Sequence, residues 1–502
     1  MKKIYYIITV LVALTVVSCS KFLEQSSQDL IRPVTVEHYK ELLQGEGYFK
    51  DFYKNGWVIE TMTDNFMVRD PEYPTDMPSA SLYKAKFAFQ WAQDLESPEG
   101  TFTDIFFKML YKNILTANTC IESLDIMEGT DKEKEVLKGQ AHFTRAYGYF
   151  VLANTYAKPY NEASADDLCV PLITSTTPSL KSYPRNTIKE VWDLITDDIE
   201  IAVDALSKDE GHRSVYELNY KAALILASRI FLFKEEFDKV IYYGERYLGI
   251  SPELKNITAV TTSPSGTGAN AIKTFLYPFE NNEIAWTFSK MTGAAQEGTY
   301  WFFTSDKTIF SPICMGASAN IDDALINIYE ANDRRKNHWF VPPTGVPGGL
   351  LVSITYSPTK VSYYDNIRFS QNMRTAEVYL NLAEAYARSS TPNNNGAIEL
   401  LNTLRANRIA SYTPITAANF TSTNSLLDFI IEERRRELCF EEFHRWWDLR
   451  RYGMPSITHD WLGEVYVLAE KDPAYILNFP KEELDFNKLL EPNIRPVRSK
   501  IN

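Results

Sequence analysis

The segment of the chain with the most reactive side chains is RRRELCFEEFHRWWDLRRYG, residues 434–453. It holds six arginines, four carboxylates, one histidine and two adjacent tryptophans. Such a set could form a catalytic acid–base cluster, a phosphate-binding surface, or a group of structural ion pairs. The spacing of the residues distinguishes these three alternatives.

The spacing argues against catalysis and against nucleic-acid binding. Glu441 and Glu442 are neighbours, so on a helix they point in different directions and cannot face each other across a glycosidic bond. His444 could be drawn as a base beside them, but a lone histidine in a charged aromatic helix is more often a hydrogen-bonded structural residue. Residues 432–451 contain six acids and six arginines, so the charges cancel. We therefore interpret the segment as a structural clamp of arginines and carboxylates.

The elements that must position this clamp follow from the apolar pattern. Read as one helix from Leu426, the segment predicts the pairs Glu432–Arg436 and Glu441–Arg445 at i,i+4. Its aromatic and leucine side chains supply more apolar surface than one narrow stripe needs. We expect this terminal helix to be held against the rest of the fold.

Upstream, the pattern predicts further helices. Apolar residues recur at helical spacing from Val136 to Tyr156, with Pro159 as a stop, and Thr187 with Glu190 forms a capping box for the next helix. Two later stretches, 224–248 and 380–408, each read as a pair of helices joined by a short turn.

Each pair carries a small residue, Ala227 or Ala383, shortly before an aromatic one, Phe231 or Tyr386. This resembles the tetratricopeptide helix pair, which buries its apolar face by stacking on neighbouring pairs, although a bare helical hairpin is the alternative. The sequence therefore predicts a predominantly α fold, a tetratricopeptide-like helical repeat scaffold with long loop excursions and a few short strands.

The first residues of the chain resemble a secretory leader. Lys2 and Lys3 precede an apolar run of 14 residues, which is too short to span a bilayer, and the run ends in VVSC. This ending resembles the lipobox of bacterial lipoproteins, so residues 1–18 are predicted to be a signal peptide and Cys19 the acylated residue. Acyl chains would anchor the protein to a membrane without a transmembrane helix. Residues 19–45 are expected to form a tether.

Composition narrows the possible functions. Asp and Glu number 65 against 52 Lys and Arg, and the net charge of -13 opposes binding to nucleic acid and to anionic lipid surfaces. The other four cysteines lack metal-ligand or disulfide spacing and are expected to be buried thiols. The sequence shows no HExxH, GxSxG or P-loop pattern, so we expect neither catalysis nor a metal or cofactor.

The stretch from Ile430 to Gly453 resembles the C-terminal signature of the SusD/RagB family, E-R-R-x-E-L-x-F-E-G-x-R-W-x-D-L-R-R. The matching positions are Glu433, Arg434, Arg435, Glu437, Leu438, Phe440, Glu441, Arg445, Trp446, Asp448, Leu449, Arg450 and Arg451. Glu442 stands where the family usually has glycine, a departure expected to affect packing and not chemistry. Further resemblance runs in order through CSKFLE, AHFTRAYGYFVLANTYAKP, NMRTAEVYLNLAEAYA, AIELLNTLRANR and YILNFPKEELDFNKLLEPN, and so covers nearly the whole mature chain.

The resemblance implies a lipoprotein of the bacterial outer membrane that faces the cell exterior. Family members sit as lids on a TonB-dependent transporter of the SusC type and capture glycans or peptides without catalysis. By this resemblance residues 46–502 form a single domain, with tetratricopeptide-like helices roughly at 131–250 and 372–452. The arginine-rich segment is then scaffold, and the membrane is contacted only through the lipid.

A ligand-facing region is expected at roughly residues 256–364, where Gly, Pro, Ser and Thr interrupt the helical pattern. Sugar capture needs aromatic rings for stacking and polar groups for the hydroxyls. Our candidate ligand residues are Asp64, Asn65, Arg69, Trp91, Tyr300 and Trp301. Glycan is the favoured cargo and peptide the alternative. A tetratricopeptide scaffold that binds only proteins also stays open, whereas a surface hydrolase would need converging carboxylates that the sequence does not display.

Overall fold

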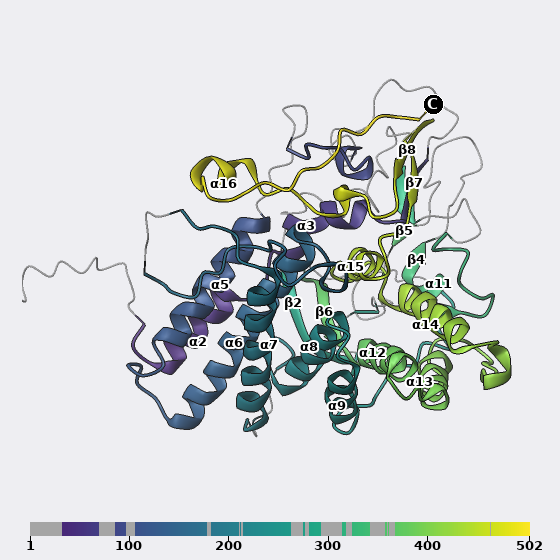
Figure 1. Cartoon of the computed structure of the whole chain (residues 1–502). Helices are drawn as coiled ribbons and strands as arrows, with labels where there is room; N and C mark the ends of the chain where they lie inside the picture. The colour runs from purple at the N-terminus through teal and green to yellow at the C-terminus, as the bar shows by residue number, and fades with distance from the viewer. Residues whose placement is uncertain are drawn as a thin grey trace, which may run out of the picture.

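The computed structural model of the chain describes residues 33–69, 86–96, 106–177, 182–209, 211, 214–262, 275–276, 281–292, 314–317, 324–341, 357–358, 360, 367–461 and 463–501. Most of the described residues belong to a stack of helices, in which most helices pack against a neighbour along the chain (Figure 1). The helices are α2 (Val36–Leu42), α3 (Phe52–Thr61), α5 (Phe106–Glu122), α6 (Asp131–Tyr156), α7 (Ile188–Ser207), α8 (Tyr220–Phe233), α9 (Phe237–Leu248), α11 (Arg334–Trp339), α12 (Thr375–Arg388), α13 (Asn394–Ala406), α14 (Thr423–Leu438), α15 (His444–Arg451) and α16 (Lys481–Phe486). This confirms the predominantly α prediction.

Local sequence signals set the ends of the longest helices. The Thr130 side chain caps α6 by accepting from the backbone N–H of Glu133, and the Glu133 carboxylate accepts from the Thr130 N–H. The same box, Thr187 with Glu190, opens α7 as predicted. α6 ends at Tyr156, before Pro159. These caps satisfy backbone groups that a helix end would otherwise leave without partners.

The two predicted helix pairs are confirmed as α8 with α9 and α12 with α13. The pairs pack on each other through α9 and α12. The two helices are closest at Gly244 of α9: a Cβ atom added to this glycine would lie 2.6 Å from Cγ of Leu382 in α12. Side-chain size therefore limits how closely the neighbouring pairs can stack.

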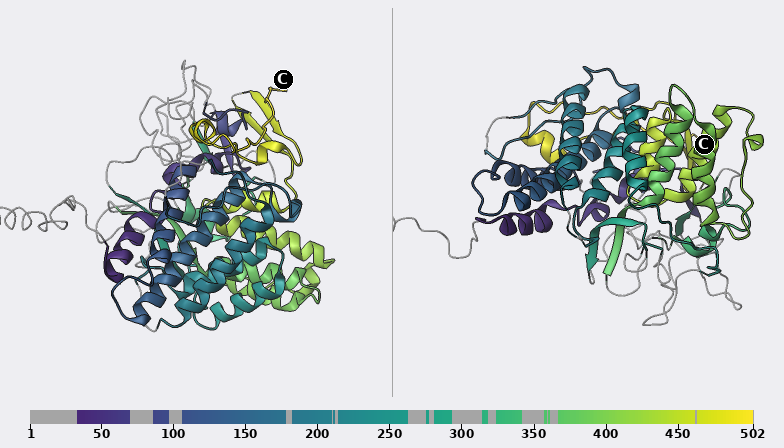
Figure 2. Two further views of the ribbon diagram at one scale, coloured as in Figure 1. Left: turned by 60° about the vertical axis from the view of Figure 1, so that its left-hand side comes forward. Right: turned by 90° about the horizontal axis from the view of Figure 1, so that it is seen from below.

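The strands are short and form antiparallel pairs. The pairs are β1 (Phe66–Arg69) with β3 (Cys314–Ala317), β2 (Ile284–Thr292) with β6 (Ile367–Arg374), β4 (Phe340–Val341) with β5 (Ser357–Pro358), and β7 (Ile457–Trp461) with β8 (Glu464–Leu468). The β1–β3 and β2–β6 pairs join segments far apart in sequence. Figure 2 shows the β7–β8 hairpin and the C-terminal segment on the side of the molecule away from α8 and α9. The prediction of a few short strands is confirmed.

The core is largely aromatic where α15 enters it. Phe443, just before α15, stacks on Phe52 of α3 with ring centroids 4.9 Å apart, and Trp447 meets Phe150 of α6 edge to face at 5.4 Å. A smaller apolar cluster fills the space among α12, α13 and α14. Burying these rings contributes to the free energy of folding.

The prediction of one continuous helix from Leu426 is wrong, because the segment forms two helices with a break between them. α14 ends at Leu438 and α15 begins at His444, because Phe440 (φ 61) and Glu442 (φ 45) adopt left-handed backbone conformations. The predicted pair of Glu432 with Arg436 forms, but that of Glu441 with Arg445 does not, since the break separates the two residues.

Cys120, Cys169 and Cys439 are buried free thiols. Among the helices of the described ranges, no helix has both the length and the apolar composition to cross a membrane.

Candidate functional site

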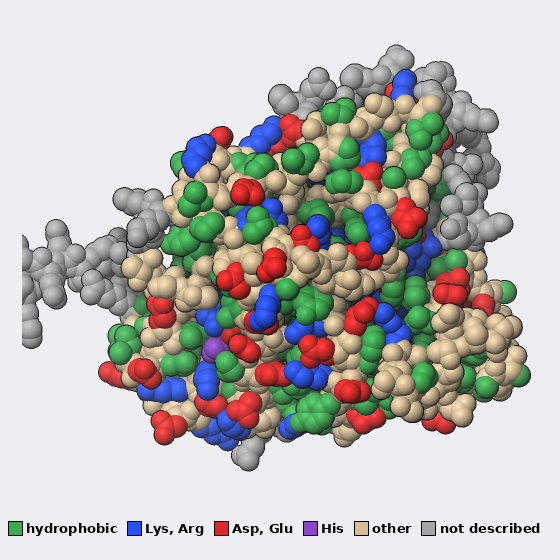
Figure 3. Space-filling view, viewed as in Figure 1, with side chains coloured by type: hydrophobic (Ala, Val, Ile, Leu, Met, Phe, Trp, Pro, Cys, Tyr) green, Lys and Arg blue, Asp and Glu red, His purple; other side chains and the backbone are tan. Residues whose placement is uncertain are grey.

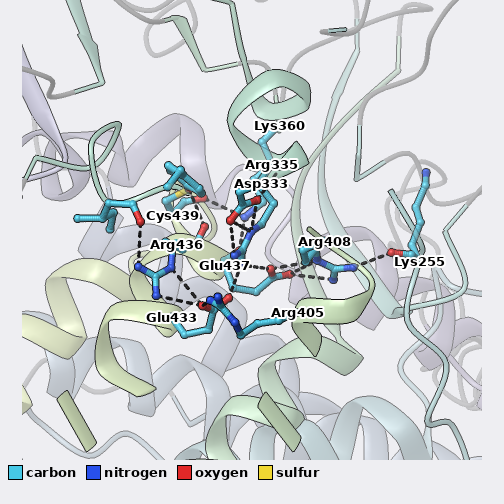
Figure 4. Close-up of polar contacts among 12 residues, drawn as sticks. Lys255, Asp333, Arg335, Lys360, Arg405, Arg408, Glu433, Arg436, Glu437 and Cys439 are labelled. Atoms are coloured by element: carbon cyan, nitrogen blue, oxygen red, sulfur yellow. Dashed lines mark hydrogen bonds and ion pairs between the residues drawn. The ribbon is translucent and has the colours of Figure 1, made fainter. Parts of the chain in front are cut away.

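Glu433, Arg436 and Glu437, near the C-terminal end of α14, lie in a buried network (Figure 4). Glu437 is at its centre: one carboxylate oxygen is 2.7 Å from Arg374 Nη1 and 2.9 Å from Arg408 Nη2, and the other is 2.9 Å from Arg335 Nη1. All four side chains are fully buried. Burial acts to raise the pKa of Glu437, but the three guanidinium groups outweigh it and hold that pKa well below its usual value.

The same network joins distant elements. Arg374, the last residue of β6, also binds Glu441 (2.7 Å) and Glu283 (2.9 Å), and Arg408 binds the other oxygen of Glu283 (2.7 Å). Because each arginine donates to carboxylates from different segments, the network fixes α14 against β6 and the turn before β2. This arrangement is architectural, as interpreted from the sequence.

A second buried cluster explains the departure at Glu442. Arg229 of α8 donates to both oxygens of Glu377 at 2.6 and 2.7 Å and to both oxygens of Glu442 at 2.6 and 2.9 Å. The Tyr147 hydroxyl donates to Glu442 at 2.6 Å. The left-handed backbone at Glu442 is one that glycine adopts without strain, which fits the glycine usual in the related signature.

His444 does not form a catalytic dyad. Its Nε2 lies 3.8 Å from Glu442 and 4.0 Å from Glu377, while its Nδ1 is 3.5 Å from Nη2 of Arg434. Burial lowers the pKa of His444 well below its usual value, and the neighbouring arginines lower it further. The ring is therefore neutral and enclosed, as expected of a structural histidine.

Two of the candidate ligand residues, Asp64 and Asn65, follow α3. The Asp64 carboxylate accepts from Nε and Nη2 of Arg445 at 2.7 and 2.6 Å, and the Asn65 side-chain oxygen accepts from Nε of Arg435 at 3.0 Å. The side chain of Asp64 keeps 26% exposure, whereas Asn65 is fully buried. Asp64 thus contacts both α14 and α15, Asn65 contacts α14, and of the two only Asp64 reaches the surface.

The ring of Trp91, a third candidate, is buried and not presented for sugar stacking in this structure. It lies parallel to the ring of His459 with centroids 4.1 Å apart, and Phe89 covers the opposite face of His459 at 4.0 Å. The Trp91 indole N–H donates to the carbonyl of Met62 at 2.9 Å. The structure therefore assigns Trp91 a contact that holds β7 to the turn after α3.

Replacing Trp91 by alanine is expected to destabilise the fold by about 3–5 kcal/mol, because a buried indole, its stacking contact and its hydrogen bond are all lost. Trp91→Phe keeps the ring stack and should cost clearly less. Urea unfolding followed by circular dichroism measures both. Equal midpoints for wild type and Trp91→Ala would contradict this assignment.

The remaining candidates lie outside the described residues, or their side chains do. Arg69 ends β1, but only its backbone is described, and Tyr300, Trp301 and Cys19 are outside the described ranges. The structure thus brings Asp64, Asn65 and Trp91 together beside α15 and β7. Their ligand role, like that of the other three, stays a prediction.

Sequence reasoning missed two participants in this region, His459 and Glu60. His459 lies in β7, where inward and outward residues alternate, and this period of two was the signal that could have placed it inside. Glu60 lies within α3 and is fully buried with no hydrogen-bond partner for its carboxylate in the part of the chain described. No local pattern distinguishes it from a solvated glutamate.

Comparison with known proteins gives two family models. One, described as starch-binding and associating with the outer membrane, matches residues 21–232, and the SusD family model matches residues 296–492. A SusD-like protein P2 from Formosa agariphila is 25% identical over an alignment of 430 positions, which covers 77% of this chain and 79% of that protein.

Solved structures agree on the fold. A SusD-like carbohydrate binding protein from Bacteroides vulgatus superposes with a TM-score of 0.68 at 18% identity, over 92% of this chain and 98% of that one. A SusD superfamily protein from Bacteroides fragilis gives a TM-score of 0.68 at 20% identity, over 91% and 98% of the two chains. The family models cover both halves of the chain, and the fold neighbours span it: the chain belongs to the SusD/RagB family.

Proposed function

We propose that this chain is a lipid-anchored outer-membrane protein that captures glycan at the cell surface and delivers it to a TonB-dependent transporter of the SusC type. The observation that carries the proposal is the match to a family described as starch-binding and associated with the outer membrane. The lipobox-like ending of the leader at Cys19 supports anchoring through acyl chains.

The proposal assigns capture and not catalysis to the chain. In the arginine-rich segment the carboxylates of Glu433, Glu437 and Glu441 are each paired with arginine or lysine, so they are poor general acids and bases. A bound sugar would be recognised through stacking and hydroxyl contacts. We propose Tyr300 and Trp301 for the stacking contacts and Arg69 with the exposed edge of Asp64 for the polar ones.

Affinity gel electrophoresis of the soluble chain starting after Cys19 against a panel of polysaccharides tests this proposal. Retardation by at least one glycan is expected, and Trp301→Ala should weaken it about tenfold or more, because a stacking ring is lost. Tyr242→Ala, which removes an exposed ring on α9, is the matched control and should leave retardation unchanged. Failure of every glycan, with saturable binding of oligopeptides in calorimetry, would instead favour peptide cargo.

A further inference from the structure

The buried side chains around Glu442 include more carboxylates than cations. We call Tyr147, Arg229, Glu377, Glu442 and His444 the Glu442 cluster. All five side chains are buried, and the single guanidinium of Arg229 donates to all four carboxylate oxygens of Glu377 and Glu442. If both carboxylates were ionised, one of them would lack a positive charge of its own.

Water does not screen the charge of this cluster. Figure 3 shows Asp and Glu side chains among Lys and Arg over one face of the molecule, where solvent weakens any local excess of charge. The side chains of Glu377 and Glu442, in contrast, are 1% and 0% exposed. A carboxyl group that is buried without enough positive charge takes up a proton instead of staying ionised.

His444 does not supply the missing positive charge. Its Nδ1 lies 3.5 Å from Nη2 of Arg434, and since a guanidinium only donates, this ring nitrogen is the acceptor. The ring hydrogen is then on Nε2, which faces Glu442 at 3.8 Å and Glu377 at 4.0 Å. Arg434 is itself paired with Asp448 at 2.8 Å. The imidazole is therefore neutral, and the charge of Arg434 is already balanced.

The other cations near the cluster have carboxylate partners outside it. Arg374 contacts three such carboxylates, and Lys360 contacts one of the three. From β6, the uncharged side-chain oxygen of Gln371 accepts from the backbone N–H of Glu442. Among the described residues, Arg229 is therefore the permanently charged cation that is paired with Glu442.

The two carboxyl groups approach each other at one point. Oε1 of Glu442 and Oε2 of Glu377 both accept from Nη2 of Arg229, at 2.9 and 2.7 Å, and both face Nε2 of His444. We propose that the folded protein binds one proton on this pair of carboxyl groups. The proton makes the Glu442 cluster neutral, and it thereby stabilises the break before α15 against α6, α8 and α12.

The direction of the pH dependence follows from the surroundings of Glu442. Burial raises the pKa of Glu442 above its usual value; Arg229 and the Tyr147 hydroxyl, which donates to the carboxylate, offset part of the rise, while Glu377 adds to it. The folded state thus keeps a proton that the unfolded state releases near pH 4.5, and this stabilisation is lost as the pH rises through the pKa of the folded state. Because the related signature usually has glycine at this position, we expect the effect in this chain and not throughout the family.

Infrared spectroscopy of the full chain tests the proposal, since the C=O stretch of a protonated carboxyl group is distinct from the bands of a carboxylate. The spectra are recorded in the Glu60→Gln background, because burial also raises the pKa of Glu60, to about 8. At about pH 7, where exposed carboxyl groups are ionised, Glu60→Gln should show a carboxyl band that Glu60→Gln/Glu442→Gln lacks.

Glu384→Gln in the same background is the matched control. Glu384 is fully buried in α12, and burial acts to raise its pKa, but Arg451 and Arg388 hold the pKa of Glu384 at about 2. Its carboxylate is therefore ionised throughout the measurement. Replacing it should leave the carboxyl band unchanged.

Two further measurements do not depend on that band comparison. Tyr147→Phe keeps both carboxyl groups but removes a hydrogen bond that favours ionised Glu442, so the pH at which the band disappears should rise. The stabilising effect is measured by hydrogen exchange of residues 443–452. The ratio of their exchange rate in wild type to that in Glu442→Gln should grow about tenfold between about pH 6 and about pH 9.

Each of these measurements can overturn the proposal. A carboxyl band that is the same in Glu60→Gln and Glu60→Gln/Glu442→Gln, or absent from both, would show that Glu442 binds no proton. An unshifted band in Tyr147→Phe would place the proton on another group. An exchange ratio that does not change with pH would show that the proton does not stabilise the break before α15.

Discussion

Arg374→Met is expected to destabilise the fold by about 3–5 kcal/mol, because three buried carboxylates each lose one of their cationic partners. Arg374 is fully buried, and its guanidinium contacts Glu283, Glu437 and Glu441 at 2.7–2.9 Å. Methionine fills most of the volume but carries no charge. The loss is therefore electrostatic, and it falls on three segments at once.

Urea unfolding measures this effect without the ionic screening that guanidinium would add. Arg246→Met, on the exposed face of α9, is the matched control and should change stability by less than about 0.5 kcal/mol. Adding Glu441→Gln to Arg374→Met should recover part of the loss, because the buried network then carries one negative charge fewer. An Arg374→Met midpoint equal to that of the control would show that the network contributes little.

Features encoded locally were predictable from the sequence. The caps at Thr130 and Thr187 and the helix pairs α8–α9 and α12–α13 depend on residues a few positions apart, and the structure shows each of them. The break between α14 and α15 was not predictable in this way. It is held by contacts of Glu441 with Arg374 and of Glu442 with Arg229, whose partners are distant in the chain.

The candidate site was likewise not predictable where contacts between distant segments decide the role of a residue. Asp64, Asn65 and Trp91 were chosen because their residue types suit sugar binding, yet the structure uses them largely to bind Arg445, Arg435 and the β7 hairpin. Residue type alone does not tell whether a tryptophan ring faces solvent or a buried histidine. Burial is decided by which distant segment packs over the ring, and the sequence carries no local signal of that.

Glu60 is expected to make the free energy of unfolding decrease as the pH rises. Its carboxylate is buried, and burial raises the pKa of Glu60 from 4.5 to about 8. The side chain of Asn65 and the charge of Arg445 offset part of the rise, while the nearby carboxylate of Asp64 adds to it. Between pH 4.5 and about 8 the folded state holds a proton that the unfolded state has released, so the free energy of unfolding decreases with pH. Below pH 4.5 both states are protonated and the effect vanishes.

The Glu60→Gln variant, which keeps the shape but cannot ionise, should therefore be more stable than wild type by an amount that grows with pH. The rise in the pKa of Glu60 corresponds to a difference in the free energy of unfolding between variant and wild type of about 5 kcal/mol once the pH exceeds 8. This difference should approach zero near pH 4.5. Urea unfolding of both proteins across this range measures it, with the exposed Glu37→Gln as the control whose difference from wild type stays flat. If the difference in the free energy of unfolding between Glu60→Gln and wild type does not depend on pH, the pKa of Glu60 is the same in the folded and unfolded states. The buried carboxylate would then be ionised in the folded protein at no cost to stability.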